Sequence, residues 1–162
     1  MIKTYDFYKR VLDSLKEYAV FTTDKDGLIT SWNEGAEKMM LYSVDEVKGR
    51  NGDILYTPED LQLNVPAMEL SSALREGMAI NERFHLKKGG FKFWGSGLVF
   101  PLFDNENEHV GFTKVMRNIS EELQAKKNLH EEKALASIIV SSSDEPIVIL
   151  NDNLDVITAT PS

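Results

Sequence analysis

The hydrophobic pattern of the first part of the chain changes from helical to strand periodicity. Apolar side chains at helical spacing between charges over 5–17 predict an amphipathic N-terminal helix at 1–17. Residues 18–24 and 28–33 are rich in β-branched and aromatic types, which favours two strands. The Asp26-Gly27 pair between them is typical of a hairpin turn.

Capping signals place the helices that follow. Asn33 stands at the expected N-cap of a short helix, and Ser43 with Glu46 three residues later forms a capping box for another, which ends at Gly49. Residues 59–76 form a longer helical stretch, within which Pro66 is suited to the first turn of a new helix whose approximate cap is Asn64.

Three more strands are predicted after the helices, over 80–88, 91–103 and 109–119, separated by glycine-rich or polar turns. A run of hairpins cannot form a parallel sheet. The order of two strands, three helices and three strands therefore predicts an α+β fold with a five-stranded antiparallel sheet over 18–120.

The segment from Ser120 to about Leu135 is charged and favours helix, which predicts a linker helix over 121–136. A heptad-like seam runs along it, interrupted by Glu132, and consists of Ala125, Leu129, Ala136 and Ile139. Two interpretations remain open, a solvated linker and a parallel dimeric coiled coil.

The last residues repeat the first strand pair. Residues 145–162 align without a gap on 17–34 when shifted by 128, with matching hydrophobic positions. We interpret 137–162 as the truncated start of a second, similar domain. Because a lone strand pair cannot bury a core, we expect 140–162 to be poorly ordered or to pack on a partner.

Composition narrows the function classes. The chain has 162 residues, no cysteine and a formal net charge of −8, so nucleic acid is a poor candidate partner and cysteine chemistry is excluded. The start lacks a signal-peptide pattern, and no run is long enough to span a bilayer. We find no catalytic constellation or metal-binding histidine cluster, so we expect a non-catalytic, cytoplasmic segment.

Four stretches together resemble the PAS domain family. They are FTTDKDGLITSWNEGAEKMMLYSVDEVKGR at 21–50, TPED at 57–60, ERFHLKKGGFKFWGSG at 82–97 and GFTKVMRNIS at 111–120. Asn118 and Ser120 replace the family's usual Asp and Thr, which join the last strand to the outgoing helix.

The resemblance implies a sheet and helices around a small cavity, in a sensory domain of a signalling protein such as a histidine kinase. The ligand is unknown. The photoreactive cysteine of light-sensing relatives would fall at Gly52, so cysteinyl–flavin photochemistry is excluded, while non-covalent flavin stays compatible with the sequence. No histidine lies on the long helix at 61–76, which disfavours haem b.

The resemblance also implies which face of strand 91–103 lines the cavity, and Gly95 and Gly97 lie on that face. Strand glycines often mark the close approach of a ligand, although large residues could instead fill the gap. The candidate ligand-binding residues are Phe21, Met40, Met68, His85, Phe93, Gly95 and Gly97.

Both faces of this strand are apolar, since Trp94 and Phe100 lie on the side opposite the glycines. The outer face of the sheet therefore needs a cover. We expect the N-terminal helix or a second copy to supply it, in a homodimer formed through that helix and the sheet. The pair His130-Glu131 lacks the Arg and Pro of a phosphoacceptor motif and is set aside.

Overall fold

The computed structural model describes residues 4–142 and 148–159. The chain divides into two compact units, Met1–Ser120 and Glu121–Ser162. Each unit is considered by itself.

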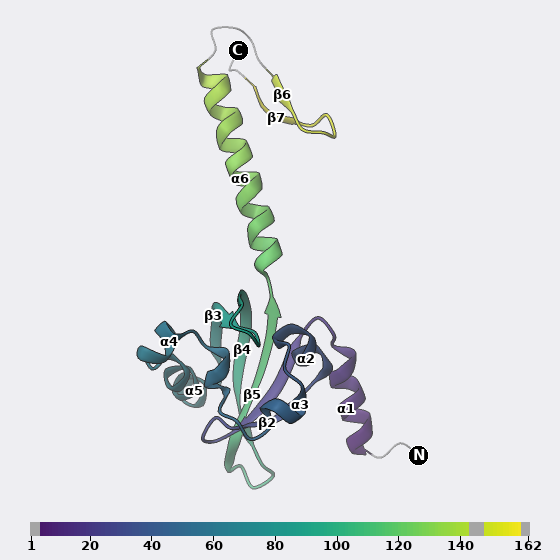
Figure 1. The fold of residues 1–162 in the computed structure, drawn as a ribbon, viewed down its shortest axis with the longest axis vertical. Coiled ribbons are helices and arrows are strands. Elements are labelled where there is room, and N and C mark those ends of the chain that lie inside the picture. Colours follow the sequence, from purple (N-terminus) through teal and green to yellow (C-terminus); the bar gives the residue numbers. More distant parts are fainter. Residues whose placement is uncertain (1–3, 143–147, 160–162) are drawn as a thin grey trace. The chain divides into compact units, whose positions relative to one another are not determined.

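The first unit is built on a five-stranded antiparallel sheet, as the hairpin pattern predicted (Figure 1). Its strands are β1 (Ala19–Asp24), β2 (Ile29–Trp32), β3 (Ala79–Leu86), β4 (Lys92–Phe103) and β5 (His109–Asn118). The spatial order is β2-β1-β5-β4-β3, so the first and last strands in sequence lie side by side at the centre. The sheet thus joins the two ends of the unit.

Short helices connect β2 to β3. They are α2 (Glu34–Met40), α3 (Val44–Val47), the 3-10 helix η1 (Gly52–Leu55), α4 (Pro58–Gln62) and α5 (Val65–Glu76). Asn64 is the N-cap of α5 with Pro66 in its first turn, and Ser43 and Glu46 form the capping box of α3, which confirms both predictions. α2 packs on β1, and α5 packs on β3 and β4 (Figure 1).

Two apolar clusters fill the space between helices and sheet. The larger one is made of Ala19, Phe21, Ile29, Trp32, Ala36, Met40, Val47, Leu55, Tyr56, Phe93 and Met116. The smaller one, made of Ala73, Ala79, Val99 and Phe112, lies under α5. The polar groups described below are embedded in this interior.

Asn33 connects three elements, which extends its predicted role as an N-cap. Its Oδ1 accepts from the backbone N–H of Ala36 at 2.8 Å, inside α2, and from that of Val20 at 2.9 Å, on β1. Its Nδ2 donates to the carbonyls of Leu12 and Tyr18. The single amide therefore joins α1 (Thr4–Ser14), β1 and α2.

α1 does not cover the outer face of the sheet. It packs against α2, and its apolar side chains Tyr8 and Val11 are exposed. On the sheet, Ile80, Phe84 and Leu98 also stay exposed. Within the single chain α1 does not supply the cover, because it is joined to α2 through Asn33. The alternative of a second copy stays a prediction.

The second unit holds a helix and a hairpin. α6 (Ser120–Ser141) begins directly after β5 and continues past residue 136, where we had placed the end of the linker. β6 (Val148–Leu150) and β7 (Val156–Ala159) form the hairpin of the predicted repeat.

The repeat is offset by 127 residues and not by 128. Asp24 accepts from the N–H groups of Asp26 and Leu28, and Asn151 accepts from those of Asn153 and Asp155 in the same way. The strand registers agree with this offset. The gapless alignment was one residue out because it matched carboxylates, whereas an amide takes the structural role in the second turn.

The order of 140–162 stays a prediction, since 143–147 and 160–162 lie outside the described residues. In the described hairpin, Val148, Leu150 and Val156 are exposed. Their apolar surface is therefore free to pack elsewhere.

Candidate functional site

Three of the candidate ligand-binding residues are part of the packed core. Phe21, Met40 and Phe93 are all buried. The ring of Phe21 lies 4.9 Å from that of Trp32, centroid to centroid. These three residues pack against protein in the described chain, and their assignment to ligand binding stays a prediction.

Gly95 and Gly97 do not border an open space. A Cβ on Gly95 would lie 2.7 Å from His85 Cδ2 and 2.8 Å from Met116 Sδ. A Cβ on Gly97 would lie 2.6 Å from the carbonyl oxygen of Val115. The two glycines let β4 approach its neighbours closely, and protein groups fill the gap, as in the second of the two interpretations left open by the sequence.

Met68 lies on the outer side of α5 and is 61% exposed. It borders a surface groove together with Met78 and Ile80. Its assignment to the cavity is therefore wrong. The helical stretch was identified correctly, but its orientation depends on which side chains the domain buries, and these are Pro66, Glu69 and Ala73.

His85 is 1% exposed and takes part in a polar network. Its Nε2 lies 2.6 Å from Asn81 Oδ1, and its Nδ1 lies 3.1 Å from the carbonyl oxygen of Leu55. Burial lowers the pKa of His85 to about 4, although the Leu55 carbonyl acts in the opposite direction. In the described chain His85 is thus a hydrogen-bonded core residue.

The inner face of β3 is polar and its outer face is apolar, the reverse of a usual half-buried strand. Asn81 and His85 are buried, and Arg83 is half-buried on the same side. Ile80 and Phe84 point outward and are exposed. The strand therefore supplies hydrogen-bonding groups to the interior.

Four buried groups from separate elements meet at this face. Lys114 Nζ on β5 donates to Tyr56 Oη at 2.7 Å, and Tyr56 donates to Glu69 Oε2 at 2.7 Å. The amide nitrogen of Asn81 donates to Glu69 Oε2 at 2.7 Å. The cluster therefore ties α5, β3, β5 and the segment after η1 together by charge-assisted hydrogen bonds.

An ion-paired arginine closes the outer side of the cluster. Arg83 Nε lies 2.8 Å from Glu69 Oε1, and one terminal nitrogen lies 3.0 Å from Asp60 Oδ1. Glu69 thus has a cation as well as two neutral donors. Such pairing is the usual condition for a carboxylate to stay charged when it is buried.

Burial shifts the proton affinities of two cluster members. It lowers the pKa of Lys114 to about 8, while Glu69 and Asp53 favour the charged ammonium. Burial also raises the pKa of Tyr56 well above its ordinary value, and the neighbouring Glu69 adds to the effect. Tyr56 is therefore a neutral phenol, and Lys114 is close to its titration range near neutral pH.

A small cavity of about 130 Å³ adjoins this cluster. It is lined by Thr23, Asp26, Gly27, Asn51, Gly52, Asp53, Tyr56, Pro66, Ala67, Leu70 and Lys114. At ~30 Å³ per water this is room for about four waters. It is smaller than the roughly 300 Å³ at the lower end of sites for drug-sized ligands, so a flavin does not fit it.

Two buried groups on the cavity wall have unused hydrogen-bonding capacity. The Thr23 hydroxyl is buried and has no hydrogen-bond partner among the described residues. Lys114 is 5% exposed, and its one hydrogen bond within the described chain goes to Tyr56. An ammonium carries three donors, so the cavity offers donors to a bound molecule.

This site was not predicted from the sequence, although one of its residues has a recognisable pattern there. Lys114 alternates with Phe112 and Met116 on one face of a strand, a pattern that places a lysine in the interior. Glu69 and Tyr56 carry no comparable signal, because only the tertiary structure brings them to Lys114.

The end of the sheet is tied to the start of α6. Ser120 Oγ accepts from the N–H of Trp94 at 2.7 Å, and Asn118 Oδ1 accepts from the N–H of Ser120 at 3.0 Å. The N–H of Ile119 donates to the carbonyl of Trp94 at 3.0 Å. The substituted residues Asn118 and Ser120 therefore still connect the closing strand to the outgoing helix.

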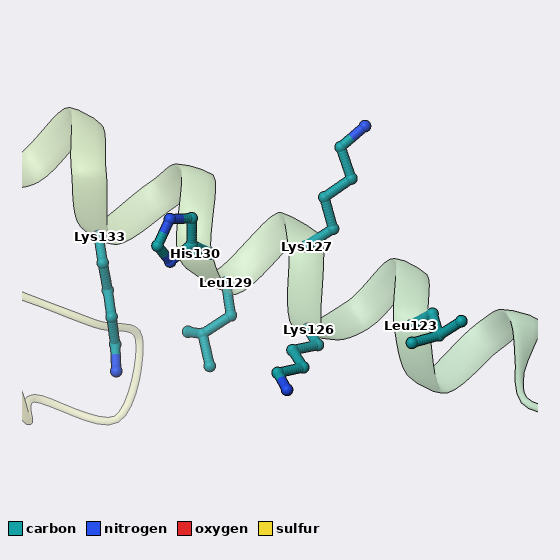
Figure 2. A pocket seen from close by; sticks show the side chains of 6 residues that line it. All are labelled: Leu123, Lys126, Lys127, Leu129, His130 and Lys133. Atoms are coloured by element: carbon teal, nitrogen blue, oxygen red, sulfur yellow. The ribbon is translucent and has the colours of Figure 1, made fainter.

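Another hollow lies along α6 and is shown in Figure 2. Its lining residues are Leu123, Lys126, Lys127, Leu129, His130 and Lys133. All six come from one helix, which cannot enclose a molecule. We therefore treat it as part of the helix surface, on which Leu129 of the predicted seam is exposed.

Residues 4–142 and 148–159 of the chain bear on two further classes of site. Within these ranges, no three His, Asp or Glu residues gather in a group that could hold a metal ion. None of the helices there has the length and apolar character that crossing a membrane requires.

Comparison with known proteins gives one family match and one relative. The model of the family described as PAS domain matches residues 17–121. Over 118 residues the chain is 37% identical to "Two-component system protein A" of Emericella nidulans, which covers 73% of this chain. The chain spans 17% of the length of that relative.

Solved structures share the fold at low sequence identity. A PAS domain from Colwellia psychrerythraea has a TM-score of 0.66 and 24% identity, covering 72% of this chain and 98% of its own. An RNA-binding light-oxygen-voltage receptor has a TM-score of 0.63 and 17% identity, and the match covers 83% of this chain and 38% of the receptor. The PAS domain of a LuxR-family transcriptional regulator from Burkholderia thailandensis, in complex with ethanol, has a TM-score of 0.58 and 18% sequence identity. The match covers 70% of this chain and 97% of that domain.

Proposed function

This chain belongs to the PAS domain family, and on that basis we propose that its first unit is a sensory domain that binds a small molecule in the cavity beside Lys114. The segment acts as a regulatory part of a signalling protein in the cytoplasm and not as a catalyst. The likeness to "Two-component system protein A" supports a two-component protein, such as a histidine kinase, as the parent.

The unused hydrogen-bonding groups carry this proposal. A buried hydroxyl without a partner costs free energy, and Thr23 has none among the described residues. A buried ammonium with one neutral acceptor, as at Lys114, is also unfavourable. A bound molecule with acceptor atoms would satisfy both groups, which supports ligand binding over a purely structural role.

The relay follows from the position of the cavity on β5. Lys114 lies on this strand, which passes directly into α6 through Asn118 and Ser120. A ligand that binds two arrangements of β5 with different affinity would bias the start of the helix. A coupling free energy of ~1–3 kcal/mol is typical of such a device.

The alternative is a PAS domain without a ligand, which serves for dimerisation and relay. One observation favours it, the filled space at Gly95 and Gly97, where His85 and Met116 leave no room for a ligand. In that case, the waters that fit the small cavity would satisfy Thr23 and Lys114.

We also propose a homodimer through the outer face of the sheet. Ile80 is 63% exposed there, with Phe84 and Leu98 beside it on β3 and β4. A shallow apolar hollow on this face is bordered by Tyr18, Ile80 and Leu98. Because α1 leaves this surface open, a second copy is the cover that we favour.

Native mass spectrometry of the freshly purified chain, together with an absorption spectrum, tests the sensory proposal. We expect a bound mass small enough for the cavity and no band above 350 nm. A bare protein mass, unchanged after incubation with a library of small metabolites, would favour the ligand-free module. Flavin or haem bands would contradict the cavity that we assign.

A further inference from the structure

We propose that the cavity beside Lys114 binds a small zwitterionic amino carboxylate, with the carboxylate turned inward to Lys114 and Thr23 and the ammonium turned outward to Asp53 and Asp26. This inference rests on the proposed sensory function and names its ligand class. The polarity of the cavity wall, its net charge and its size support it separately.

The inner end of the cavity is a set of hydrogen-bond donors. Lys114 and Thr23 are both more than nine-tenths buried, and both line the cavity. Tyr56 cannot serve as a further donor, because its hydroxyl hydrogen goes to Glu69. An ammonium and a free hydroxyl together suit a carboxylate, whose two oxygens can accept from both.

The outer end of the cavity carries acceptors. Asp26 and Asn51 on the cavity rim are exposed, and Asp53 beside them is half-buried. Two carboxylates at this end favour a ligand that brings a cation or a donor there. The two ends of the cavity therefore require opposite polarity in one molecule.

The charge balance excludes a simple anion. The groups around the cavity and its adjoining cluster are the cations Lys114 and Arg83 and the carboxylates Asp26, Asp53, Asp60 and Glu69. Arg83 is already paired with Asp60 and Glu69. At the cavity itself, one cation, Lys114, therefore faces two carboxylates, Asp26 and Asp53. An added negative charge would be repelled, whereas a zwitterion adds no net charge.

Size limits the ligand to the smallest members of the class. A cavity of about 130 Å³ holds roughly four waters' volume. Alanine, with six non-hydrogen atoms, is of this size. Pro66, Ala67 and Leu70 supply an apolar wall for a short side chain.

Isothermal titration and thermal shift on the 162-residue chain test the inference with four probes. L-alanine is the zwitterion, L-lactate the matched anion, L-lactamide the matched neutral molecule and ethanol a small neutral control. We expect alanine to bind at least tenfold more tightly than lactate or lactamide, and ethanol not to bind measurably.

Two variants locate the binding. Thr23→Val removes an unpartnered hydroxyl, so it should keep or raise the melting temperature of the free protein and weaken alanine binding about fivefold or more. Lys114→Met should weaken binding tenfold or more. Thr113→Val on the outer face of β5 and Lys25→Met in the exposed turn are matched controls, and we expect wild-type affinity for both.

The outcomes separate the inference from the proposed function. Preferred binding of lactamide or ethanol would overturn the amino carboxylate while a small-molecule sensor stands. Lactate binding as tightly as alanine would overturn the role of Asp26 and Asp53. Alanine binding unchanged in Thr23→Val and Lys114→Met would overturn the site. If no probe binds and native mass spectra show a bare protein, both proposals fail.

Discussion

At the scale of single residues, neighbouring side chains occupy the space that a side chain at Gly95 would take in the interior of this domain. The space beside Gly95 is occupied by His85 and Met116, and His85 is held there by Asn81 and the Leu55 carbonyl. A glycine in a strand can signal room for a ligand or room for a neighbour. Here the neighbour is a hydrogen-bonded ring.

Gly95→Ala should destabilise the domain. The new Cβ would lie 2.7 Å from a ring that two hydrogen bonds hold in place, so His85 or the flexible Met116 must move. Overpacking of this kind costs about 1–3 kcal/mol. Urea unfolding measures it, and the cost should shrink when Met116→Ala is added. Ser96→Ala is the control. If Gly95→Ala and Ser96→Ala lowered the free energy of unfolding by the same small amount, the tight packing at Gly95 would be contradicted.

The stability of the domain should fall in acid because of His85. Its folded pKa of about 4 lies below the ordinary 6.5, since burial disfavours the charged ring and Lys114 and Arg83 add to this. The folded state thus binds the proton more weakly than the unfolded chain. The neutral His85 ring therefore contributes to the free energy of unfolding in full above pH 6.5, and this contribution is lost as the pH falls toward 4. Each unit of difference between the folded and unfolded pKa corresponds to ~1.4 kcal/mol.

The measurement compares urea unfolding at pH 7 and pH 4.5 in wild type and His85→Gln. We expect the wild type to lose about 2–3 kcal/mol more than the variant between these conditions, because carboxylate effects are common to both. His130→Gln on α6 serves as the control and should behave as the wild type. An identical loss in wild type and His85→Gln would show that this ring carries no acid sensitivity.

At the scale of elements, three hairpins have turns with the same hydrogen-bond pattern. Asp24, Asp104 and Asn151 each accept the N–H groups of the second and fourth residues that follow. The residue three positions on has positive φ in each turn, at Gly27, Asn107 and Leu154. The hairpin of the second unit thus repeats the local chemistry of the hairpin formed by β1 and β2.

Asp24→Ala should destabilise the β1–β2 hairpin by about 1 kcal/mol for the acceptor it removes, while Asp24→Asn should be nearly neutral. The physical reason is that an amide oxygen holds the same turn at Asn151. Hydrogen exchange of the Leu28 amide reports the local effect, and urea unfolding reports the global one. Loss of protection in Asp24→Asn as well would show that the charge and not the geometry is needed.

At the scale of the whole molecule, the question is what lies on the open face of the sheet. If a second copy covers it, Ile80→Glu should shift the protein from dimer to monomer, because the side chain is exposed in the single chain and the new charge would be buried without a partner in the dimer. Leu63→Glu, at an exposed site after α4, is the matched control. Analytical ultracentrifugation gives the mass, and an unchanged dimer in Ile80→Glu would contradict this interface.

The sequence by itself determined the elements and their order. Caps at Asn33 and Ser43 and the hairpin at Asp26-Gly27 rest on interactions within a few residues, so local chemistry specified them. The run of hairpins predicted the antiparallel sheet that the structure shows. The repeat was also visible, but its offset was one residue out because strand pairing sets the register.

Only the tertiary structure decided the candidate site. Met68 and Glu69 are neighbours on one helix, and packing on β3 and β4 placed the carboxylate inside and the thioether outside. The buried charge is stable there because Tyr56, Asn81 and Arg83 reach it from other elements. Such long-range compensation of a buried charge leaves no periodic trace in the chain, and the cavity that it borders was therefore found in the fold alone.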